Sequence, residues 1–383
     1  MDEKLLSLTT FKNISERVEF LEKKLKVKAK YLNHLAFSED LVINKNIENL
    51  VGAVQVPLGI AGPILINDQV YYLPLATTEG ALVASVSRGA KAVCLSDGVK
   101  SFTENAGMSR GPVFKASNLT QAFEAKKWLE ENFKLLKEIT EETSDHLKLL
   151  KIDKAISGRS VFIKFVYDCD EAMGMNMVTI ATTVASSLIE QETKLKLISI
   201  AGNYDVDKKP AWLNTIDGRG RKVWAEAVIK KTIVEKVLKT TTEKIVEVVI
   251  RKDLIGSAMS GSMGFNAHFA NVVAALFLAT GQDLAHIVEG SLGITSAEKL
   301  ENGDLYFSVY LPAICLGVIG GGTGLPAQRN ALEILKLTMS KKSEEFAQVL
   351  AGAVLAGELS LTASLAQNSL AKAHIRLGRG AKE

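Results

Sequence analysis

Cysteine is scarce in this sequence. Cys94, Cys169 and Cys315 are the three among 383 residues, and they are widely spaced and form no CxxC pair. Their number and spacing favour neither a disulfide framework nor a zinc site, so no bound metal is expected. They are typical of a protein of the reducing cytoplasm, in which each cysteine is a small core residue.

The sequence also lacks a charge excess and a long apolar run. Lys and Arg total 46 against 43 Asp and Glu, and this net charge of +3 is too balanced for a nucleic-acid binder. Among the most apolar runs are Val272–Ala279 and Val349–Ala356, which fall well short of the ~20 residues of a membrane-spanning helix. The N-terminus is charged from its second residue, so it is not a secretory signal. We therefore expect a cytoplasmic protein with no nucleic-acid and no membrane partner.

Apolar residues and glycines are plentiful. Hydrophobic residues make up 47% of the chain, and 29 glycines stand against 7 prolines. The length suggests two or three domains that bury a core without help from metals or disulfides. The pattern of apolar, charged and glycine residues along the chain predicts an α/β (α+β) protein. It has a helical segment at 1–35, a large helix-rich domain at 36–111 and 200–383, and a small α+β domain at 112–199.

Glu79 is the first residue that can carry chemistry. It follows Thr77 and Thr78, either of which can cap an apolar helix that continues to Cys94. A carboxylate beside Gly80 at this place is a general-acid candidate. The alternative is a first-turn glutamate that complements the helix dipole, and this segment alone favours that alternative.

A second candidate is the turn ahead of Pro210, with Asp207, Lys208 and Lys209. Lysine can stabilise a developing oxyanion, whereas the alternative is a solvated charged turn. Asp283 follows a later apolar helix and is either a cap or a buried carboxylate paired with a lysine and a glutamate. Along that helix, His268 and Asn271 are equally compatible with satisfied core polar groups and with binding.

Two further segments are ambiguous on their own. GGGTG at 320–324 could cradle phosphates through its main-chain amides, but it does not fit the GxGxxG signature and could be a simple turn. His374 lies near the C-terminus beside Arg376 and is either a mobile catalytic acid or a solvated surface residue.

Taken together, the segments resemble one known family, the 3-hydroxy-3-methylglutaryl-CoA reductases, and especially their eukaryotic and archaeal branch. From about residue 36 onwards the chain contains, in order, ENLVGAVQVPLGIAGP, ATTEGALVAS, SRGPV, EAMGMNM, GNYDVDKKPAWLNTIDGRG, GSAMSGSMGFNAH, TGQD and VIGGGTGLPAQ. The resemblance implies reduction of a thioester to mevalonate and free coenzyme A by two hydride transfers from a nicotinamide cofactor. It also implies a small ferredoxin-like cofactor domain inserted in the large domain, and an active site between two subunits of a homodimer or higher even-numbered oligomer.

The same resemblance implies roles for individual residues. The catalytic residues are Glu79, Lys208, Asp283 and His374. The substrate-binding residues are Arg110, Asp207, Lys209, Lys252 and Asn271, with Ser85, Arg88 and His268 on the coenzyme A side. The cofactor-binding residues are Ser144, Asp145, Glu171, Met173, Gly174, Met175, Asn176, Gly320, Gly321 and Gly322. His374 would protonate the departing thiolate from a mobile C-terminal tail.

The sequence departs from the family pattern at two cofactor positions. Glu171 stands where the family usually has Asp, and Asp145 stands where members that use NADPH carry a basic residue. An Asp would repel the 2′-phosphate and favours NADH, whereas the family branch favours NADPH. Two alternative functions follow: NAD-dependent oxidation of mevalonate, and non-catalytic binding of a coenzyme A thioester.

Overall fold

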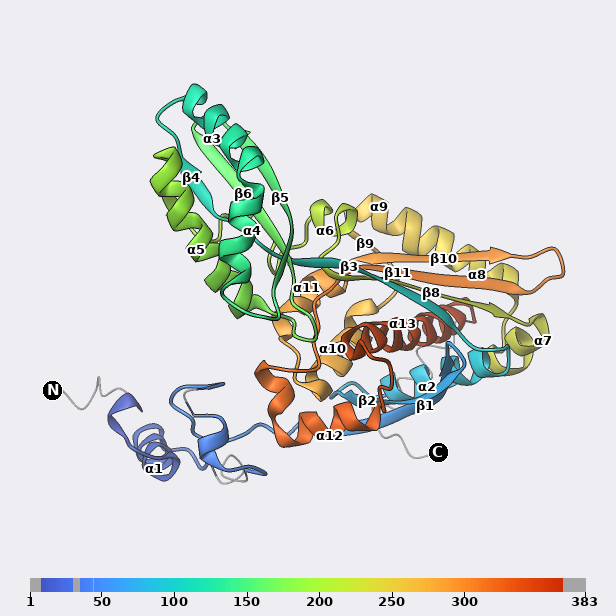
Figure 1. Cartoon of the computed structure of the whole chain (residues 1–383). Coiled ribbons are helices and arrows are strands. Elements are labelled where there is room, and N and C mark those ends of the chain that lie inside the picture. The colour runs from blue at the N-terminus through green and yellow to red at the C-terminus, as the bar shows by residue number, and fades with distance from the viewer. Residues whose placement is uncertain (1–7, 30–34, 44, 368–383) are drawn as a thin grey trace.

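The computed structural model describes residues 8–29, 35–43 and 45–367 (Figure 1). Its elements form a large unit, a small unit that rises from one side of it, and an N-terminal segment at the edge of the molecule. Helices and strands are mixed along the chain, so the predicted mixed α/β fold class is confirmed.

The large unit is built on a sheet in the order β3-β8-β11-β10-β9. Neighbouring strands are antiparallel except for β9 and β10, which pair in parallel. The strands are β3 (Lys100–Arg110), β8 (Gly220–Ile229), β9 (Gly264–Phe265), β10 (Gly293–Lys299) and β11 (Leu305–Ile314). Alternate side chains of β8 are buried, as expected for a strand with one face on a core.

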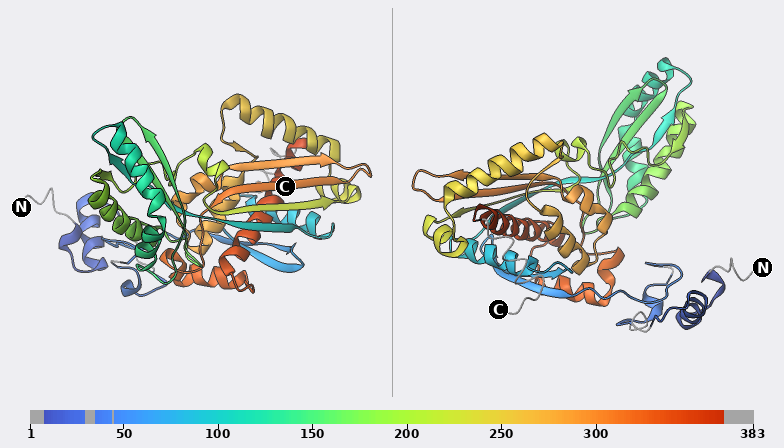
Figure 2. Two further views of the ribbon diagram at one scale, coloured as in Figure 1. Left: turned by 45° about the horizontal axis from the view of Figure 1, so that its top comes forward. Right: turned by 180° about the vertical axis from the view of Figure 1, so that it is seen from behind.

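A long central helix, α13 (Lys342–Ala366), fills the interior (Figure 2). It contacts β3, β8 and β11 of the sheet, and also α2 (Leu82–Cys94) and α10 (Phe269–Thr280). The antiparallel hairpin of β1 (Leu58–Ile66) and β2 (Gln69–Ala76) packs on these last two helices. A β-carbon at Gly89 of α2 would collide with the main-chain oxygen of Ala356, so this glycine lets α2 and α13 cross closely.

The apolar run at 349–356 is the middle of this longer helix. By length and composition α13 could cross a membrane, but 83% of its most apolar window is buried inside the protein. A helix that is apolar on all sides belongs in a protein core or a membrane, and the burial here identifies a core helix.

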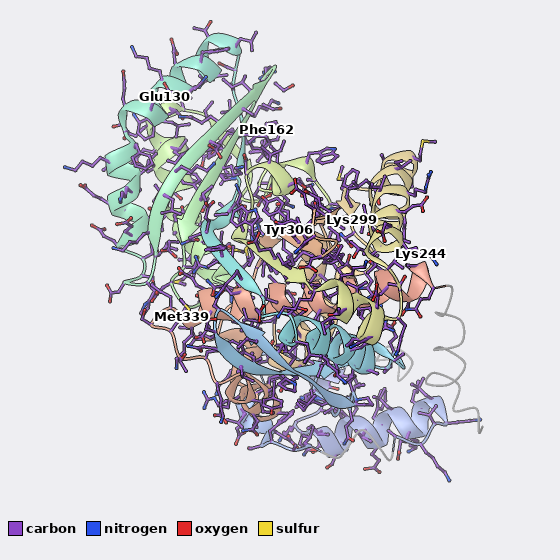
Figure 3. The ribbon with its side chains drawn as sticks, turned by 90° about the vertical axis from the view of Figure 1, so that its right-hand side faces the viewer. Glu130, Phe162, Lys244, Lys299, Tyr306 and Met339 are labelled. Carbon is purple, nitrogen blue, oxygen red and sulfur yellow. The ribbon has the colours of Figure 1, made fainter. Side chains whose placement is uncertain are left out.

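The small unit contains β4 (Val113–Lys115), α3 (Leu119–Glu131), α4 (Phe133–Glu141), β5 (Lys148–Ser157), β6 (Ser160–Asp168), α5 (Met175–Thr193) and β7 (Lys196–Ser199). Its strand order is β7-β4-β6-β5, which is the ferredoxin-like arrangement. It has its own hydrophobic core, separate from that of the large unit. Figure 3 shows Glu130 and Phe162 on this unit, well away from Lys244 and Lys299 of the large unit.

The two units share a continuous strand path. The last residues of β3 and then β4 pair with successive stretches of β6, so the two sheets are joined edge to edge. Arg110 is the last residue of β3, directly where the chain leaves the large unit for the small one.

Shorter helices complete the large unit. They are α6 (Trp212–Ile216), α7 (Lys231–Ile233), α8 (Thr242–Val248), α9 (Ser257–Ser260), α11 (Ile287–Gly290) and α12 (Pro326–Ile334), with π-helical turns η4 (Val234–Leu238) and η5 (Val249–Gly256) and 3-10 turns η6 (Leu284–His286) and η7 (Gly321–Gly324).

The N-terminal segment contains 3-10 turns η2 (Leu8–Thr10) and η3 (Glu39–Leu41) and the helix α1 (Ile14–Leu25). This helix is shorter than the one predicted for 1–35, because Asn13 caps its start and Lys26 turns left-handed with φ 55°. Buried Arg17 ties the segment together by donating to the main-chain oxygens of Leu50 and Phe11.

Candidate active site

A cavity of about 750 Å³ lies where distant parts of the chain meet. Its wall comes from the end of β3, the turn ahead of Pro210, the start of α5, the segment after α10 and the glycine-rich loop. The predicted site residues in this wall are Arg110, Asp207, Lys208, Asp283, Met173, Gly174, Met175, Asn176, Gly320, Gly321 and Gly322.

Lys208 and Asp283 form an ion pair on this wall. The ammonium Nζ lies 2.9 Å from Oδ2, and both side chains keep rather more than a third of their surface exposed, at 38% and 37%. Asp283 also caps η6, because Oδ1 accepts the N–H of Ala285 at 3.0 Å. Burial alone would raise the pKa of Asp283, but the hydrogen bonds from Lys208 and Ala285 lower it below its usual range. Asp283 is therefore both a cap and a paired, ionised carboxylate.

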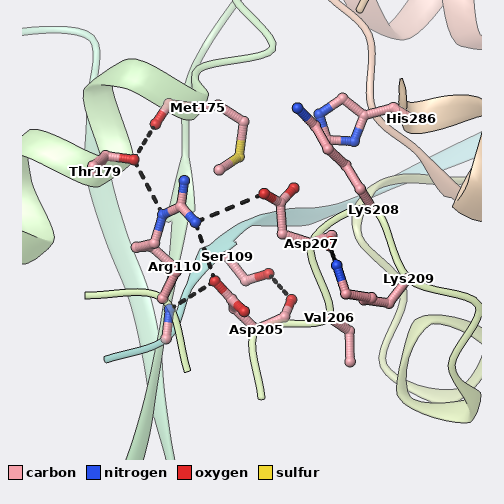
Figure 4. Close-up of polar contacts among 12 residues, drawn as sticks. Ser109, Arg110, Met175, Thr179, Asp205, Val206, Asp207, Lys208, Lys209 and His286 are labelled. Atoms are coloured by element: carbon pink, nitrogen blue, oxygen red, sulfur yellow. Dashed lines mark hydrogen bonds and ion pairs between the residues drawn. The ribbon is translucent and has the colours of Figure 1, made fainter. Parts of the chain in front are cut away.

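Arg110 is held beside this pair by two carboxylates and a hydroxyl (Figure 4). Its Nε donates to Oγ1 of Thr179 at 3.1 Å, and Nη1 lies 3.4 Å from Asp205 Oδ2 and 3.7 Å from Asp207 Oδ2. Asp205 is buried, and it also accepts the N–H of Gly111 at 3.2 Å. The guanidinium is thus fixed at the junction of the two units with part of its surface on the cavity.

The glycine-rich loop lies against the segment that starts α5. The N–H of Val318 donates to the main-chain oxygen of Glu171 at 2.9 Å, and Ala172 forms a β-bridge with Ile319. Gly174 precedes α5 with φ 89°, and no side chain within the described part of the chain caps the first amides of that helix. Free amides at a helix start beside a glycine loop suit phosphate groups, so these residues fit a nicotinamide dinucleotide.

Three predicted cofactor residues do not lie on the cavity wall. Oε2 of Glu171 accepts the N–H of Ser343 at 2.8 Å, near the start of α13. Ser144 contacts Met177, with 3.2 Å between Oγ and Sδ. Asp145 is exposed on the turn that contains Ser144.

Glu79 lies apart from Lys208 and Asp283. The helix α2 begins at Leu82 and not after Thr77 or Thr78, because Ala81 is left-handed with φ 79°. Glu79 is therefore outside the first turn, and the helix-dipole alternative does not hold. Its Oε2 accepts from Nδ2 of Asn271 at 2.5 Å.

The helix α10 separates the predicted catalytic residues into two pairs. Asn271, the partner of Glu79, is in the first turn of α10, whereas Asp283 follows its last residue, Thr280. At 1.5 Å per residue, the helix between Asn271 and Thr280 is about 14 Å long. One chain thus presents Glu79 with Asn271 at one end of α10 and Lys208 with Asp283 at the other.

The remaining predicted cations are also dispersed. Lys252 donates to Asp253 at 2.7 Å and lines a second cavity of about 740 Å³, together with Pro210 and Ser257. Lys209 is exposed, and its Nζ donates to the main-chain oxygen of Asp207 at 3.3 Å. Within one chain, then, Arg110, Lys209 and Lys252 do not converge on one cavity.

The residues expected on the coenzyme A side contact α13. Ser85 donates to Oγ of Ser360 at 3.0 Å, and Nη2 of Arg88 donates to Oγ of Ser364 at 2.6 Å. His268 Nδ1 lies 3.2 Å from Oε1 of buried Glu358, so in this chain the ring faces α13. His374 lies outside the described residues.

Sequence reasoning missed a buried polar group beneath Lys208. It consists of Arg219, His286 and Glu289, each at most 1% exposed, with the thiol of Cys315 alongside. The spacing of three residues from Asp283 to His286, and again from His286 to Glu289, was the available sequence signal, since it places all three residues on one helical face.

His286, Glu289 and Cys315 are grouped closely enough to suggest a metal site. However, Nη1 of Arg219 already lies 2.8 Å from Glu289 and 3.3 Å from His286, so a cation occupies their centre.

Known proteins resemble the chain along nearly its whole length. Residues 13–379 match the protein family described as hydroxymethylglutaryl-coenzyme A reductase. The 3-hydroxy-3-methylglutaryl-coenzyme A reductases of Methanothermobacter thermautotrophicus and Methanocaldococcus jannaschii are each 48% identical, over 95% of this chain and 93% and 92% of theirs. A class II 3-hydroxy-3-methylglutaryl-CoA reductase of Streptococcus pneumoniae, bound to NADPH, superposes with a TM-score of 0.71 at 18% identity and covers 94% of this chain and all of that one, which supports the fold.

These findings first define a class, the NAD(P)H-dependent oxidoreductases. The chain belongs, within that class, to the hydroxymethylglutaryl-coenzyme A reductase family and is of the archaeal type. Its function is accordingly reduction of 3-hydroxy-3-methylglutaryl-CoA in the mevalonate pathway.

Proposed function

We propose that the chain reduces 3-hydroxy-3-methylglutaryl-CoA to mevalonate and coenzyme A as a homodimer, or a higher even-numbered oligomer, of the cytoplasm. The observation that carries the assignment of residues is the Lys208–Asp283 pair, 2.9 Å apart on a wall shared with Arg110, the start of α5 and the glycine-rich loop. A cation, a carboxylate-binding arginine and a phosphate-fitting backbone there match the three parts of the reaction: oxyanion, substrate carboxylate and dinucleotide.

The residues divide the proton chemistry between them. Lys208 holds the carbonyl oxygen as negative charge develops on it, and Asp283 orients the ammonium group. Glu79 donates a proton to the alkoxide, with Asn271 orienting its carboxyl group. His374 protonates the thiolate of coenzyme A, and Arg110, Lys209 and Lys252 bind the substrate carboxylate, beside Asp207. Two reduced nicotinamide dinucleotides, bound one after the other along 173–176 and 320–322, would each supply one hydride.

The most direct test follows the loss of nicotinamide absorbance at saturating thioester, with NADH and NADPH offered separately. We expect turnover and release of free thiol with at least one of them. Thioester binding without oxidation of either cofactor would instead favour a non-catalytic binding protein.

Asp145 supports a preference for NADH. Its carboxylate is exposed beside Ser144, which contacts Met177 near the start of α5, while the nearby basic side chains His146 and Lys341 are engaged by Asp170, at 3.3 Å and 2.5 Å. A carboxylate there would repel a 2′-phosphate. Asp145→Ser should raise kcat/KM for NADPH about tenfold, which corresponds to the loss of one unfavourable charge contact, and leave that for NADH within about twofold. An unchanged ratio of kcat/KM between NADPH and NADH would mean that the 2′-phosphate of NADPH binds away from Asp145.

A preference for NAD would also be compatible with mevalonate oxidation as the physiological direction. The ratio of the forward to the reverse rate measures that direction.

His374→Ala should separate the two halves of the reaction. Removal of a general acid costs about 10²–10⁴-fold in the step that needs it. We therefore expect that loss with the thioester and a much smaller one with free mevaldehyde, from which no thiolate departs. Equal losses on both substrates would rule out protonation of the thiolate as the role of His374.

A further inference from the structure

The buried group beneath Lys208 holds this residue at both of its ends. Oε1 of Glu289 accepts the main-chain N–H of Lys208 at 3.1 Å. At the other end, Oδ2 of Asp283 lies 2.9 Å from the ammonium of Lys208 and 3.6 Å from Nε2 of His286. His286 connects the two contacts, because its Nδ1 lies 2.9 Å from the same Oε1 of Glu289.

Lys208 needs such support. Its φ of 55° is left-handed, a conformation that a residue with a long side chain adopts only when its surroundings hold it there. The side chain is otherwise more than a third exposed and has four rotatable bonds, so a single ion pair would place the ammonium group poorly. His286 and Glu289 are fully buried, and they hold the main chain directly and the ammonium through Asp283.

The charges around His286 balance when it is protonated. Asp283 and Glu289 face it from its own segment, and Arg219 and Cys315 face it from the loop before β8 and the end of β11. Counted with the connected side chains, the carboxylates are Asp205, Asp207, Asp283 and Glu289, and the permanent cations are Arg110, Lys208 and Arg219.

His286 supplies the missing fourth positive charge. Burial alone would lower the pKa of His286, but Cys315 and Glu289 raise it to about 9, so the ring is cationic at neutral pH. Both of its N–H groups can then donate, one to Glu289 and one toward Asp283. Without that contact, Nε2 of His286 has no hydrogen-bond partner among the described residues.

We propose that His286 and Glu289 are positioning residues of this reductase, which together fix the main chain and the ammonium group of Lys208 for oxyanion stabilisation. The proposal rests on the role of Lys208 given above. The protonated ring of His286 and the carboxylate of Glu289 together carry no net charge. Removal of both charges should therefore lower kcat less than removal of either one.

The test uses amide replacements in the full-length enzyme. His286→Gln and Glu289→Gln each leave one buried charge uncompensated, and each should lower kcat about tenfold with KM for the thioester within about twofold, because a displaced ammonium group affects the transition state most. The double variant removes one charge of each sign and should recover to within about threefold of the wild type. Glu345→Gln is the matched control: it neutralises another buried carboxylate, which binds Tyr71 and Thr338, and should leave kcat unchanged.

The outcomes distinguish this proposal from the one it rests on. If Lys208→Met keeps turnover, the role of Lys208 fails whatever His286 does. If Lys208→Met is inactive but the single variants match Glu345→Gln, or if their losses multiply in the double variant, the positioning role is overturned. If the single variants do not fold, the pH dependence of kcat in the wild-type enzyme tests the proposal instead. This kcat should fall with a midpoint near pH 9 as His286 loses its proton. A kcat that stays level to about pH 10 overturns the proposal.

Discussion

Replacement of Lys208 by Met is expected to lower kcat about 10³-fold or more and to leave the fold intact. Removal of one neutral hydrogen-bond donor from an oxyanion site costs about 10²–10³-fold, and Lys208 supplies a full charge. The side chain is 38% exposed and methionine keeps its apolar length, so the melting temperature should change little. Single-turnover kinetics with saturating thioester and cofactor would measure the chemical step directly.

Lys209→Met is the matched control for this prediction. The two lysines are neighbours in one turn, but Lys209 is exposed and its Nζ contacts the main-chain oxygen of Asp207. We assign it to the substrate carboxylate, so its loss should raise KM for the thioester more than it lowers kcat. If both variants lose only affinity for substrate, Lys208 does not stabilise the oxyanion.

Local sequence alone indicated part of the fold, whereas the site residues needed the family resemblance. The elements from β4 to β7 lie within 112–199, where short strands and amphipathic helices leave a clear periodic pattern. The wall residues 173–176 and 320–322 were expected only from the family resemblance, although the consecutive glycines 320–322 allow a close approach of the backbone.

Other features depend on contacts between residues far apart in the sequence, and the local sequence gives little indication of them. The start of α2 at Leu82 follows from the left-handed Ala81, and the engagement of Glu171 follows from the position of α13, more than 170 residues later in the chain. The charges beneath Lys208 could have been suspected from the spacing of His286 and Glu289, but Arg219, which completes the group, comes from a separate loop. Burial of charge is a property of the assembled core, so single segments do not reveal it.

Mixing two inactive variants is expected to restore activity. The pair of Glu79 and Asn271 lies at one end of α10, and the pair of Lys208 and Asp283 lies beyond the other, about 14 Å away by helix rise alone. Chemistry at one carbonyl requires all of these groups within hydrogen-bond reach. A two-fold symmetric dimer satisfies this when each site takes Glu79 from one subunit and Lys208 from the other.

Co-expression of Glu79→Gln with Lys208→Met should therefore give roughly a quarter of the wild-type activity per chain, because half of the randomly formed dimers are mixed and each mixed dimer holds one intact site. Two different tags on the variants allow the mixed dimers to be purified before the assay. The control combines Lys208→Met with Asp283→Asn, whose side chains contact each other within one chain, so the mixed dimer has no intact site and should stay inactive. Purified mixed dimers of the first pair with no activity above the single variants would mean that one chain supplies all four residues, which would require Glu79 to move from Asn271 to Lys208 when substrate binds.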